Sequence, residues 1–426
     1  MFRMGTPCPN IYALDCTALM LPYAASKTMP PVYRVAAALT EEIDADILGQ
    51  AVRDLVPRFP ALYVKLRKGF FWDRLEHTPG RGIAMEDGEP CRPFQYKDRE
   101  EPLLRVLYHG NELAVECSHF SADATAAMAY LNSLAARYLE LRGYAIEKSR
   151  IVLDCRDEPT EAELADGYRA VYEKPKDKKV PLEGMAYKYL ARRRDGRRQI
   201  TQVQMPIDAT KRLLKEKYGG CTVSEYLIAV YACAFLQLYK IIPKQRRPIR
   251  FSIPIDLRHF WPMDTLRNFA AAASVTLLPA QADCGFQDIL EHVRREMREN
   301  VTQEKMRAFI SQTVSYLDML GAVPGFVKRL AVRAGSPLLG KAVWPYTSSI
   351  SNLGYIRLPP SLAEHVQSCT FALGGFDLPR IVCAAVGVNN VMTVTFSSVD
   401  ECAVRDFCIA FWERDGLPVR VTVRDF

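Results

Sequence analysis

Residues 114–128 read AVECSHFSADATAAM, and this stretch decides the fold. Apolar and polar residues alternate over 112–118, which predicts a half-buried β-strand. His119 ends that strand, Asp123 comes four residues later, and an alanine-rich run from 124 to about 142 predicts a helix. Aspartate is favoured at helix N-caps, where its side chain accepts from the first backbone N–H groups. The stretch therefore predicts a strand, a loop that holds a histidine and an aspartate, and a helix.

Spacing alone leaves two interpretations of this pair open. His119 and Asp123 can form a catalytic H-x-x-x-D constellation. They can also be a partly buried histidine at a strand end and an ordinary capping aspartate. With six histidines in the chain, roughly one protein in three would contain the pattern by chance, given the average abundance of Asp. The choice between these two interpretations depends on the rest of the sequence.

Working outward, the chain divides into two halves of similar size. We predict an N-terminal half at 1–172, a basic linker at 173–198 and a C-terminal half at 199–426. In the first half, an amphipathic helix is expected within 40–59, with Thr40 as its N-cap. Strands are expected at 61–67, 69–75, 103–108 and 112–118. In the second half, strands are expected near 198–205, 247–258, 268–279, 346–359, 366–375, 380–388, 391–399 and 418–423. Helices are expected near 208–218, 222–241, 286–320, 324–341 and 401–415. This alternation indicates a mixed α/β fold.

The net charge of +7 has a local origin. Residues 174–198 hold ten Lys or Arg against three Asp or Glu, so the rest of the chain is balanced. That balance argues against a nucleic-acid-binding surface spread over the fold. The basic segment is either a solvated connection, a dock for an acidic carrier protein, or a site for the phosphates of a nucleotide-like cofactor.

The twelve cysteines form no C-x-x-C pair and no metal-ligand cluster, so we expect reduced thiols, no metal and a cytoplasmic location. No apolar run follows the basic residue near the N-terminus, so no signal peptide is expected. The longest apolar stretch, 222–242, is interrupted by Glu225, Gln237 and Lys240. A buried helix is therefore expected there and no membrane span.

Three segments together resemble one superfamily. They are SHFSADA at 118–124, PIDLRHFWPMDTLRNF at 254–269 and ISNLGYIRLP at 350–359. Their motifs, order and spacing resemble those of nonribosomal peptide condensation domains, alcohol acetyltransferases, the plant BAHD acyltransferases and chloramphenicol acetyltransferase. The resemblance implies an α/β fold of two chloramphenicol-acetyltransferase-like halves in a V-shaped pseudo-dimer, with mixed sheets and flanking helices. His119 would lie midway along a tunnel between the halves, and a chain with both halves can work as a monomer.

The resemblance also implies roles for individual residues. His119 would be the general base, and Asp123 would pair with Arg258 and shape the histidine loop. Tunnel-facing candidates for oxyanion donors are Asn268, Asn352, Ser349 and Ser351, although turn and strand-end hydrogen bonding would explain them equally well. The candidates for binding coenzyme A phosphates are Arg192, Arg193, Arg194, Arg197 and Arg198.

Two departures from the motifs bear on the reaction. Condensation domains carry two adjacent histidines, and here Ser118 replaces the first; Ala124 replaces the glycine after the aspartate. The single histidine is more similar to the alcohol acetyltransferases. We therefore expect an acyl-CoA-dependent O-acyltransferase that binds no permanent cofactor and uses acyl-CoA as a co-substrate. One alternative is a freestanding condensation enzyme that takes its acyl group from phosphopantetheine on an acidic carrier protein and acylates an amine. Another is a catalytically silent binding protein. The sequence has no H-E-x-x-H and no G-x-S-x-G motif of metallo- or serine hydrolases.

Overall fold

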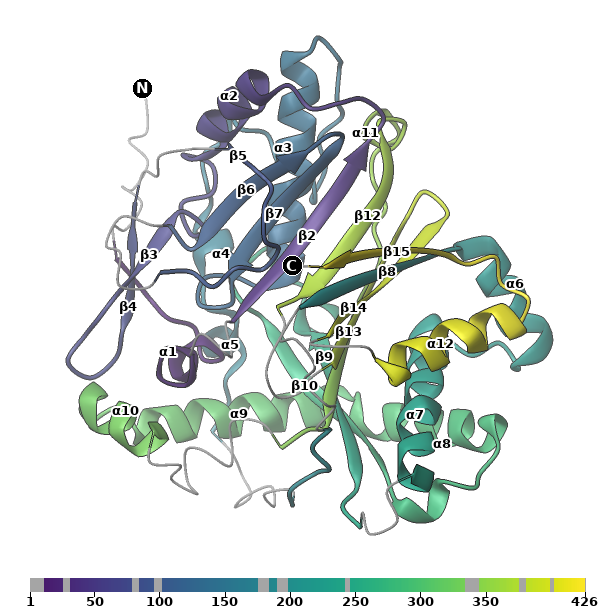
Figure 1. Cartoon of the computed structure of the whole chain (residues 1–426). Helices are drawn as coiled ribbons and strands as arrows, with labels where there is room; N and C mark the ends of the chain where they lie inside the picture. The colour runs from purple at the N-terminus through teal and green to yellow at the C-terminus, as the bar shows by residue number, and fades with distance from the viewer. Residues whose placement is uncertain are drawn as a thin grey trace, which may run out of the picture.

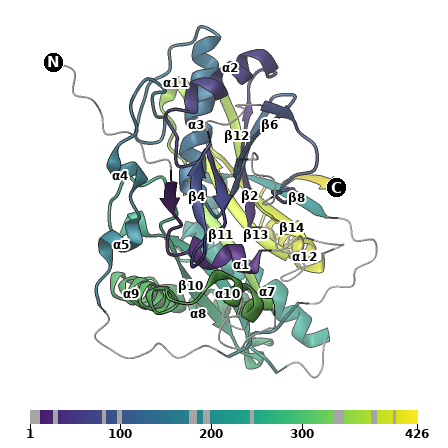
Figure 2. The same cartoon turned by 90° about the vertical axis from the view of Figure 1, so that its left-hand side faces the viewer.

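The protein is a mixed α/β molecule of two lobes, each built on a β-sheet with helices packed against it (Figure 1). The computed structural model describes residues 11–25, 31–78, 84–95, 102–174, 184–189, 198–241, 246–333, 345–374, 381–398 and 402–425. Figure 2, turned by 90°, shows that the helices and sheets of the two lobes stack one above the other.

The first lobe contains a five-stranded sheet in the order β12-β2-β7-β6-β5. Its strands are β2 (Val32–Leu39), β5 (Ala84–Glu86), β6 (Leu104–His109), β7 (Glu112–Ser118) and β12 (Val366–Leu373). Helices α2 (Ala45–Leu55) and α3 (Ala124–Leu141) cover one face, where their apolar side chains form one core with those of β2 and β7. Alternate residues of β7 enter that core, as its sequence pattern predicts.

Shorter elements complete this lobe. Strands β1, β4 and β3 form a separate three-stranded sheet. The elements are β1 (Ile11–Ala13), α1 (Leu21–Ala24), β3 (Val64–Arg67), β4 (Arg74–His77), α4 (Glu161–Leu164), α5 (Gly167–Val171) and α11 (Pro360–Ala363).

The second lobe is built on a seven-stranded mixed sheet in the order β10-β9-β11-β13-β14-β8-β15. Its strands are β8 (Gln199–Pro206), β9 (Ile249–Asp256), β10 (Ala270–Leu277), β11 (Ser348–Tyr355), β13 (Ile381–Val388), β14 (Val391–Ser398) and β15 (Arg420–Asp425). Its helices are α6 (Ile207–Lys217), α7 (Val223–Ile241), α8 (Phe286–Asn300), α9 (Gln303–Met319), α10 (Gly325–Arg333) and α12 (Ala403–Arg414). The turn between β13 and β14 is Asn389-Asn390, and both residues have positive φ, at 45° and 63°. This is the hairpin that the sequence predicts.

The longest apolar stretch of the chain forms a buried helix, and the cysteines within the described residues are free. The stretch around 222–242 forms α7, which is buried in the second lobe's core. Within the described part of the chain, no helix is both long enough and apolar enough to cross a membrane. The eleven cysteines in the described residues are free, and nine of them are buried.

The second half of the chain contributes one strand to the sheet of the first lobe. Strand β12 follows the second lobe's β11 in the sequence, yet it pairs antiparallel with β2 of the first lobe, with Phe371 opposite Val35. Figure 1 shows β12 running beside β2 along the edge of the upper sheet. A charged contact adds to this connection, because Arg424 of β15 lies 2.9 Å from Asp87. The sequence boundaries that we give for the halves stay a prediction, and the first lobe draws one strand from beyond them.

Two expected helix boundaries are wrong. Thr40 does not cap the helix that follows it; its backbone N–H donates to His365 O, and Asp44 is the N-cap, accepting from the N–H groups of Asp46 and Ile47. The helical region expected at 286–320 is two helices, because Val301 leaves the helical conformation and Thr302 caps α9. Both differences arise where the chain meets a distant segment or changes direction.

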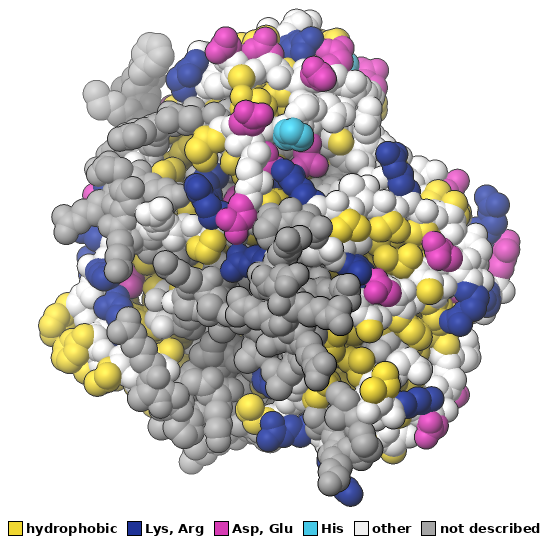
Figure 3. Space-filling model, in the orientation of Figure 1, with side chains coloured by type: hydrophobic (Ala, Val, Ile, Leu, Met, Phe, Trp, Pro, Cys, Tyr) yellow, Lys and Arg dark blue, Asp and Glu magenta, His cyan; other side chains and the backbone are white. Residues whose placement is uncertain are grey.

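Charged side chains of both signs are interspersed on the face seen in Figure 3. Lys and Arg lie next to Asp and Glu over the upper lobe and along the right-hand edge of that view. On its described residues, this face therefore carries no extended field of one sign, in keeping with a charge excess confined to the basic segment.

Candidate active site

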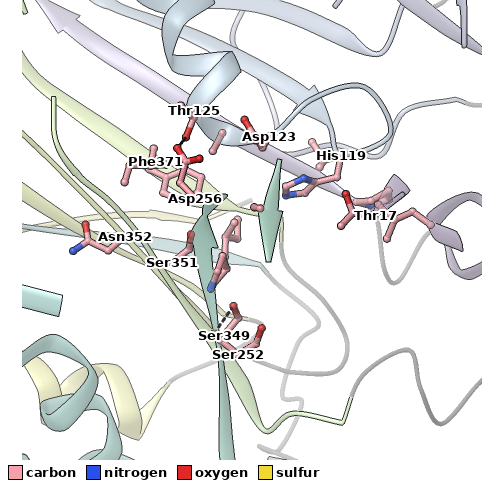
Figure 4. Close-up of a pocket in the computed structure, with 18 of the residues that line it drawn as sticks. Thr17, His119, Asp123, Thr125, Ser252, Asp256, Ser349, Ser351, Asn352 and Phe371 are labelled. Atoms are coloured by element: carbon pink, nitrogen blue, oxygen red, sulfur yellow. Dashed lines mark hydrogen bonds between the residues drawn. The ribbon is translucent and has the colours of Figure 1, made fainter. Parts of the chain in front are cut away.

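A cavity of about 400 Å³ lies between the lobes and contains His119 and Asp123 in its walls. Its lining is mainly apolar, with walls from the 17–25 segment, the histidine loop and strands β9, β10, β11 and β12 (Figure 4). The polar residues in the walls are Thr17, His119, Asp123, Thr125, Ser252, Asp256, Ser349, Ser351 and Asn352. A largely apolar cavity with a few polar groups is typical of a small-molecule site.

His119 occupies the turn between β7 and α3. Its backbone N–H donates to Pro31 O at 2.8 Å, and the Tyr33 ring packs on the imidazole with centroids 4.5 Å apart. Tyr33 is itself fixed, because its hydroxyl donates to the carbonyls of Ala122 and Asp123. Burial lowers the pKa of His119 below its ordinary value, while the hydrogen bond with Asn268 and the Asp123 charge act in the opposite direction. The imidazole is therefore neutral at pH 7, as a general base requires.

The Asp123 carboxylate supports the local structure through its hydrogen bonds. It is the N-cap of α3, and its Oδ1 accepts from the Ala126 N–H at 3.0 Å. Its Oδ2 accepts from Arg258 Nη1 and from the Phe269 N–H, both at 2.8 Å. These donors hold the carboxylate in place, so Asp123 orients the loop and is not free to act as a second base.

Arg258 donates hydrogen bonds to several groups around Asp123. It lies in a short 3-10 helix after β9, and its guanidinium also donates to Asp256 and to the carbonyls of Thr265 and Arg267. Burial disfavours its charge, but the nearby Asp123 and Asp256 carboxylates more than compensate and raise the pKa of Arg258. The pair therefore links the histidine loop of one lobe to the 256–268 segment of the other.

Asn268 is not placed to donate to an oxyanion. One amide hydrogen goes to Asp15 Oδ2 at 2.7 Å and the other to the His119 backbone carbonyl at 3.1 Å. Asn268 is buried and lies outside the cavity walls. With both amide hydrogens donated within the protein, the expected oxyanion role is corrected to a contact with the histidine itself, whose Nδ1 lies 3.5 Å from Asn268 Oδ1.

The other three expected tunnel residues do line the cavity. Ser349, Ser351 and Asn352 come from β11, and the two serines share one face of that strand. Ser349 donates to Ser252 O at 3.1 Å, and Asn352 donates to Ser224 at 3.0 Å. The Ser351 hydroxyl donates to no acceptor among the described residues, which leaves it the best placed of the three to bind a ligand oxygen.

The arginines expected to meet coenzyme A fall mostly outside the part of the chain that can be assessed. Arg192, Arg193, Arg194 and Arg197 lie outside the described residues. Arg198 is half-buried directly before β8 and is not part of the cavity walls. Their role stays a prediction.

The sequence did not point to Thr17 and Asp256, which line the cavity, or to Asp15 and Tyr33, which contact Asn268 and His119 from outside it. Asp15 and Thr17 lie in the segment IYALDCTALM, where a single acid stands among apolar residues. That isolation is a signal of a buried carboxylate, which needs several hydrogen bonds to be tolerated. Tyr33 gave no such signal, because an aromatic residue in a strand is ordinary core.

No group of three or more His, Cys, Asp or Glu side chains that could hold a metal ion occurs within the described ranges.

No family model and no curated protein matches the chain.

Solved structures match almost the whole chain. TRI101 of F. sporotrichioides, complexed with coenzyme A and T-2, is 12% identical with a TM-score of 0.64, over 96% of this chain and 99% of that one. SgcC5 of Streptomyces globisporus is 13% identical with a TM-score of 0.60, over 95% and 98%. The epimerization domain from the third module of tyrocidine synthetase B is 11% identical with a TM-score of 0.57, over 95% and 98%. The chain therefore has the same two-lobed fold as these solved structures.

Proposed function

We propose that this protein is an acyltransferase that moves an acyl group from acyl-CoA to a hydroxyl acceptor, with His119 as the general base. The observation that carries the proposal is the position of His119. Its imidazole borders a mainly apolar cavity between the lobes, and burial keeps it neutral. Asp123, the other ionisable group of the loop, is held by Arg258. The other carboxylate in the walls, Asp256, accepts from Arg258 and from the Thr125 hydroxyl, which leaves His119 as the group available to accept a proton there.

The reaction follows from this arrangement. His119 Nε2 takes the proton of the acceptor O–H as that oxygen attacks the thioester carbonyl. A C–O bond forms, the carbonyl becomes an oxyanion, and Ser351 supplies a donor in the cavity wall. When the oxyanion collapses, the C–S bond breaks and the imidazolium returns its proton to the leaving thiolate. Exclusion of water by the apolar walls limits hydrolysis of the thioester.

Coenzyme A is the proposed donor because structures of this fold, such as TRI101 of F. sporotrichioides, have been solved in complex with it. The test is thiol release from a panel of acyl-CoAs, from acetyl to long-chain, with alcohol and amine acceptors offered separately. Release that requires an alcohol acceptor supports the proposal. Release only with amines, or transfer only from an acylated carrier protein, points to a condensation enzyme instead. If the folded protein releases no thiol with any donor, a binding protein becomes the better interpretation. The cavity of about 400 Å³ has space for its ligand.

The pH dependence of the reaction gives a further prediction. A base must be deprotonated to act, so activity falls as pH drops through the pKa of His119. Burial lowers that pKa, so activity should persist below about pH 6.5, the ordinary midpoint for histidine. A profile of kcat/KM against pH should show an acid limb with its midpoint below that value. A midpoint above it would mean that a group other than His119 limits the reaction.

A further inference from the structure

Asp15 is a buried carboxylate that the mechanism above does not use. It lies in the segment that follows β1, and its side chain is fully buried. Its Oδ1 accepts from the Thr17 hydroxyl at 2.9 Å and from the Ala18 N–H at 3.0 Å. Its Oδ2 accepts from the Asn268 amide at 2.7 Å. The Arg267 guanidinium is 4.0 Å away, and Asp15 meets no part of the cavity.

These contacts fix which way the Asn268 amide faces. An ionised carboxylate only accepts hydrogen bonds, and so does a backbone carbonyl. Asp15 Oδ2 and His119 O both face the same end of the Asn268 side chain, so that end must be the NH₂ group. The amide oxygen is then left facing His119 Nδ1, at 3.5 Å. An amide oxygen can only accept, so Nδ1 must carry the proton.

We propose that Asp15 is a positioning residue which, through the Asn268 amide, holds His119 in the tautomer with hydrogen on Nδ1 and a bare lone pair on Nε2. This rests on the proposed function, in which Nε2 is the base. The Nδ1 contact is at the outer limit of a hydrogen bond, as is common for catalytic contacts before substrate is bound. The tautomer of a histidine is set by the partner of its other nitrogen.

The charge state of Asp15 suits this role. Burial raises the pKa of Asp15 to about 6, the nearby Asp166 charge adds to the rise, and Arg267, Asn268 and the Ala18 N–H oppose it. The carboxylate is therefore ionised at pH 7 and above and accepts without donating. A buried charge of this kind is tolerated because three donors, from Thr17, Ala18 and Asn268, bond to it and the Arg267 guanidinium lies nearby.

The variant that tests the proposal is Asp15→Asn, which keeps the shape and reverses the polarity of one atom. The donors Thr17 and Ala18 hold an amide oxygen at the Oδ1 position, so the new NH₂ group faces the Asn268 NH₂ group. Two donors cannot bond each other, and a flip of Asn268 restores a hydrogen bond with residue 15 at the cost of the donation to the His119 carbonyl. The flipped amide would present its NH₂ to His119 Nδ1 and move the imidazole proton to Nε2. We expect kcat to fall by about 10- to 100-fold, the range typical of partners that orient metal-ligating histidines, with KM unchanged.

The tautomer is measured directly by ¹⁵N chemical shifts of the imidazole in histidine-labelled protein at about pH 8, assigned with His119→Gln. Wild type should show a protonated Nδ1 and a bare Nε2, and Asp15→Asn should shift His119 toward the opposite tautomer. This readout needs no substrate, so it separates failure of this inference from failure of the proposed reaction. An unchanged His119 tautomer in folded Asp15→Asn would overturn the inference.

A second variant separates positioning from structure. In the double variant Asp15→Asn/Asn268→Asp, the new amide donates to the new carboxylate, whose other oxygen accepts from His119 Nδ1–H, while the donation to the His119 carbonyl is lost. We expect the double variant to recover the wild-type tautomer and part of kcat lost in Asp15→Asn. Asn268→Asp alone places two carboxylates next to each other and should destabilise the fold. If the double variant folds and keeps the tautomer of Asp15→Asn, the relay through Asn268 is refuted.

Discussion

Replacing His119 with alanine should lower kcat for acyl transfer by about 10²- to 10⁴-fold, the usual contribution of a general base. The alanine variant has no free group that can take the acceptor proton at this point of the cavity, because Asp123 is held by Arg258 and two backbone N–H groups, and Asp256 accepts from Arg258 and the Thr125 hydroxyl. KM should change little, since the imidazole is one group in a large apolar wall. Thiol release under saturating donor and acceptor measures the effect.

The fold should survive this change. The hydrogen bonds that hold the loop at residue 119 use its backbone, whose N–H donates to Pro31 and whose carbonyl accepts from Asn268. Both remain in the alanine variant. His365→Ala is a matched control, because His365 also packs on a tyrosine, Tyr144, with ring centroids 4.3 Å apart, and lies outside the cavity walls. That control should keep full activity. A His119→Ala protein with near wild-type kcat would disprove the assignment of the base.

Removal of the Asp123 carboxylate should have the largest effect on stability. Asp123→Ala leaves the Arg258 guanidinium in a largely buried site without its main partner, at a cost of about 3–5 kcal/mol in the free energy of unfolding. It also removes the N-cap of α3, and the Phe269 N–H loses its acceptor. Urea unfolding followed by circular dichroism measures the loss, and turnover should fall with it because the histidine loop loses its support.

Two further variants provide a scale for this loss in the free energy of unfolding. Asp123→Asn keeps an acceptor for the α3 N–H and loses the charge, so it should destabilise the protein less than alanine does. Asp264→Ala breaks an exposed pair with Arg150, whose side chains are 59% and 78% exposed, and should cost less than about 1 kcal/mol. If Asp123→Ala costs no more than Asp264→Ala, the Asp123–Arg258 pair does not hold the lobes in the way described.

The parts that the sequence predicted well are those decided by neighbouring residues. The alternation in 112–118 and the alanine-rich run after Asp123 are local patterns, and the strand, the loop and the capped helix appear where they indicate. The Asn389-Asn390 turn is equally local. The proximity of Arg258 to Asp123, by contrast, was expected only from the resemblance, since no property of either segment brings them together.

What could not be predicted depends on contacts between distant segments. Thr40 has the right chemistry for an N-cap, but its backbone is bonded to His365, so the helix begins after Asp44. Asn268 looked suited to face the tunnel, but Asp15, far away in the sequence, takes its amide hydrogen. In both cases a residue of suitable type is already used by a partner that only the folded chain supplies.

The pairing of β12 with β2 of the first lobe has a consequence for synthesis on the ribosome. Leu39 ends β2 and Val366 begins β12, so 326 residues lie between the two partners. At about 5–20 residues per second this takes on the order of 20 to 60 s. During that delay the nascent first lobe presents an unpaired β2 edge, a template for pairing with other chains. Completion of the first lobe therefore waits until most of the second has been made, and chaperones that shield strand edges should matter more here than for a protein whose lobes close independently.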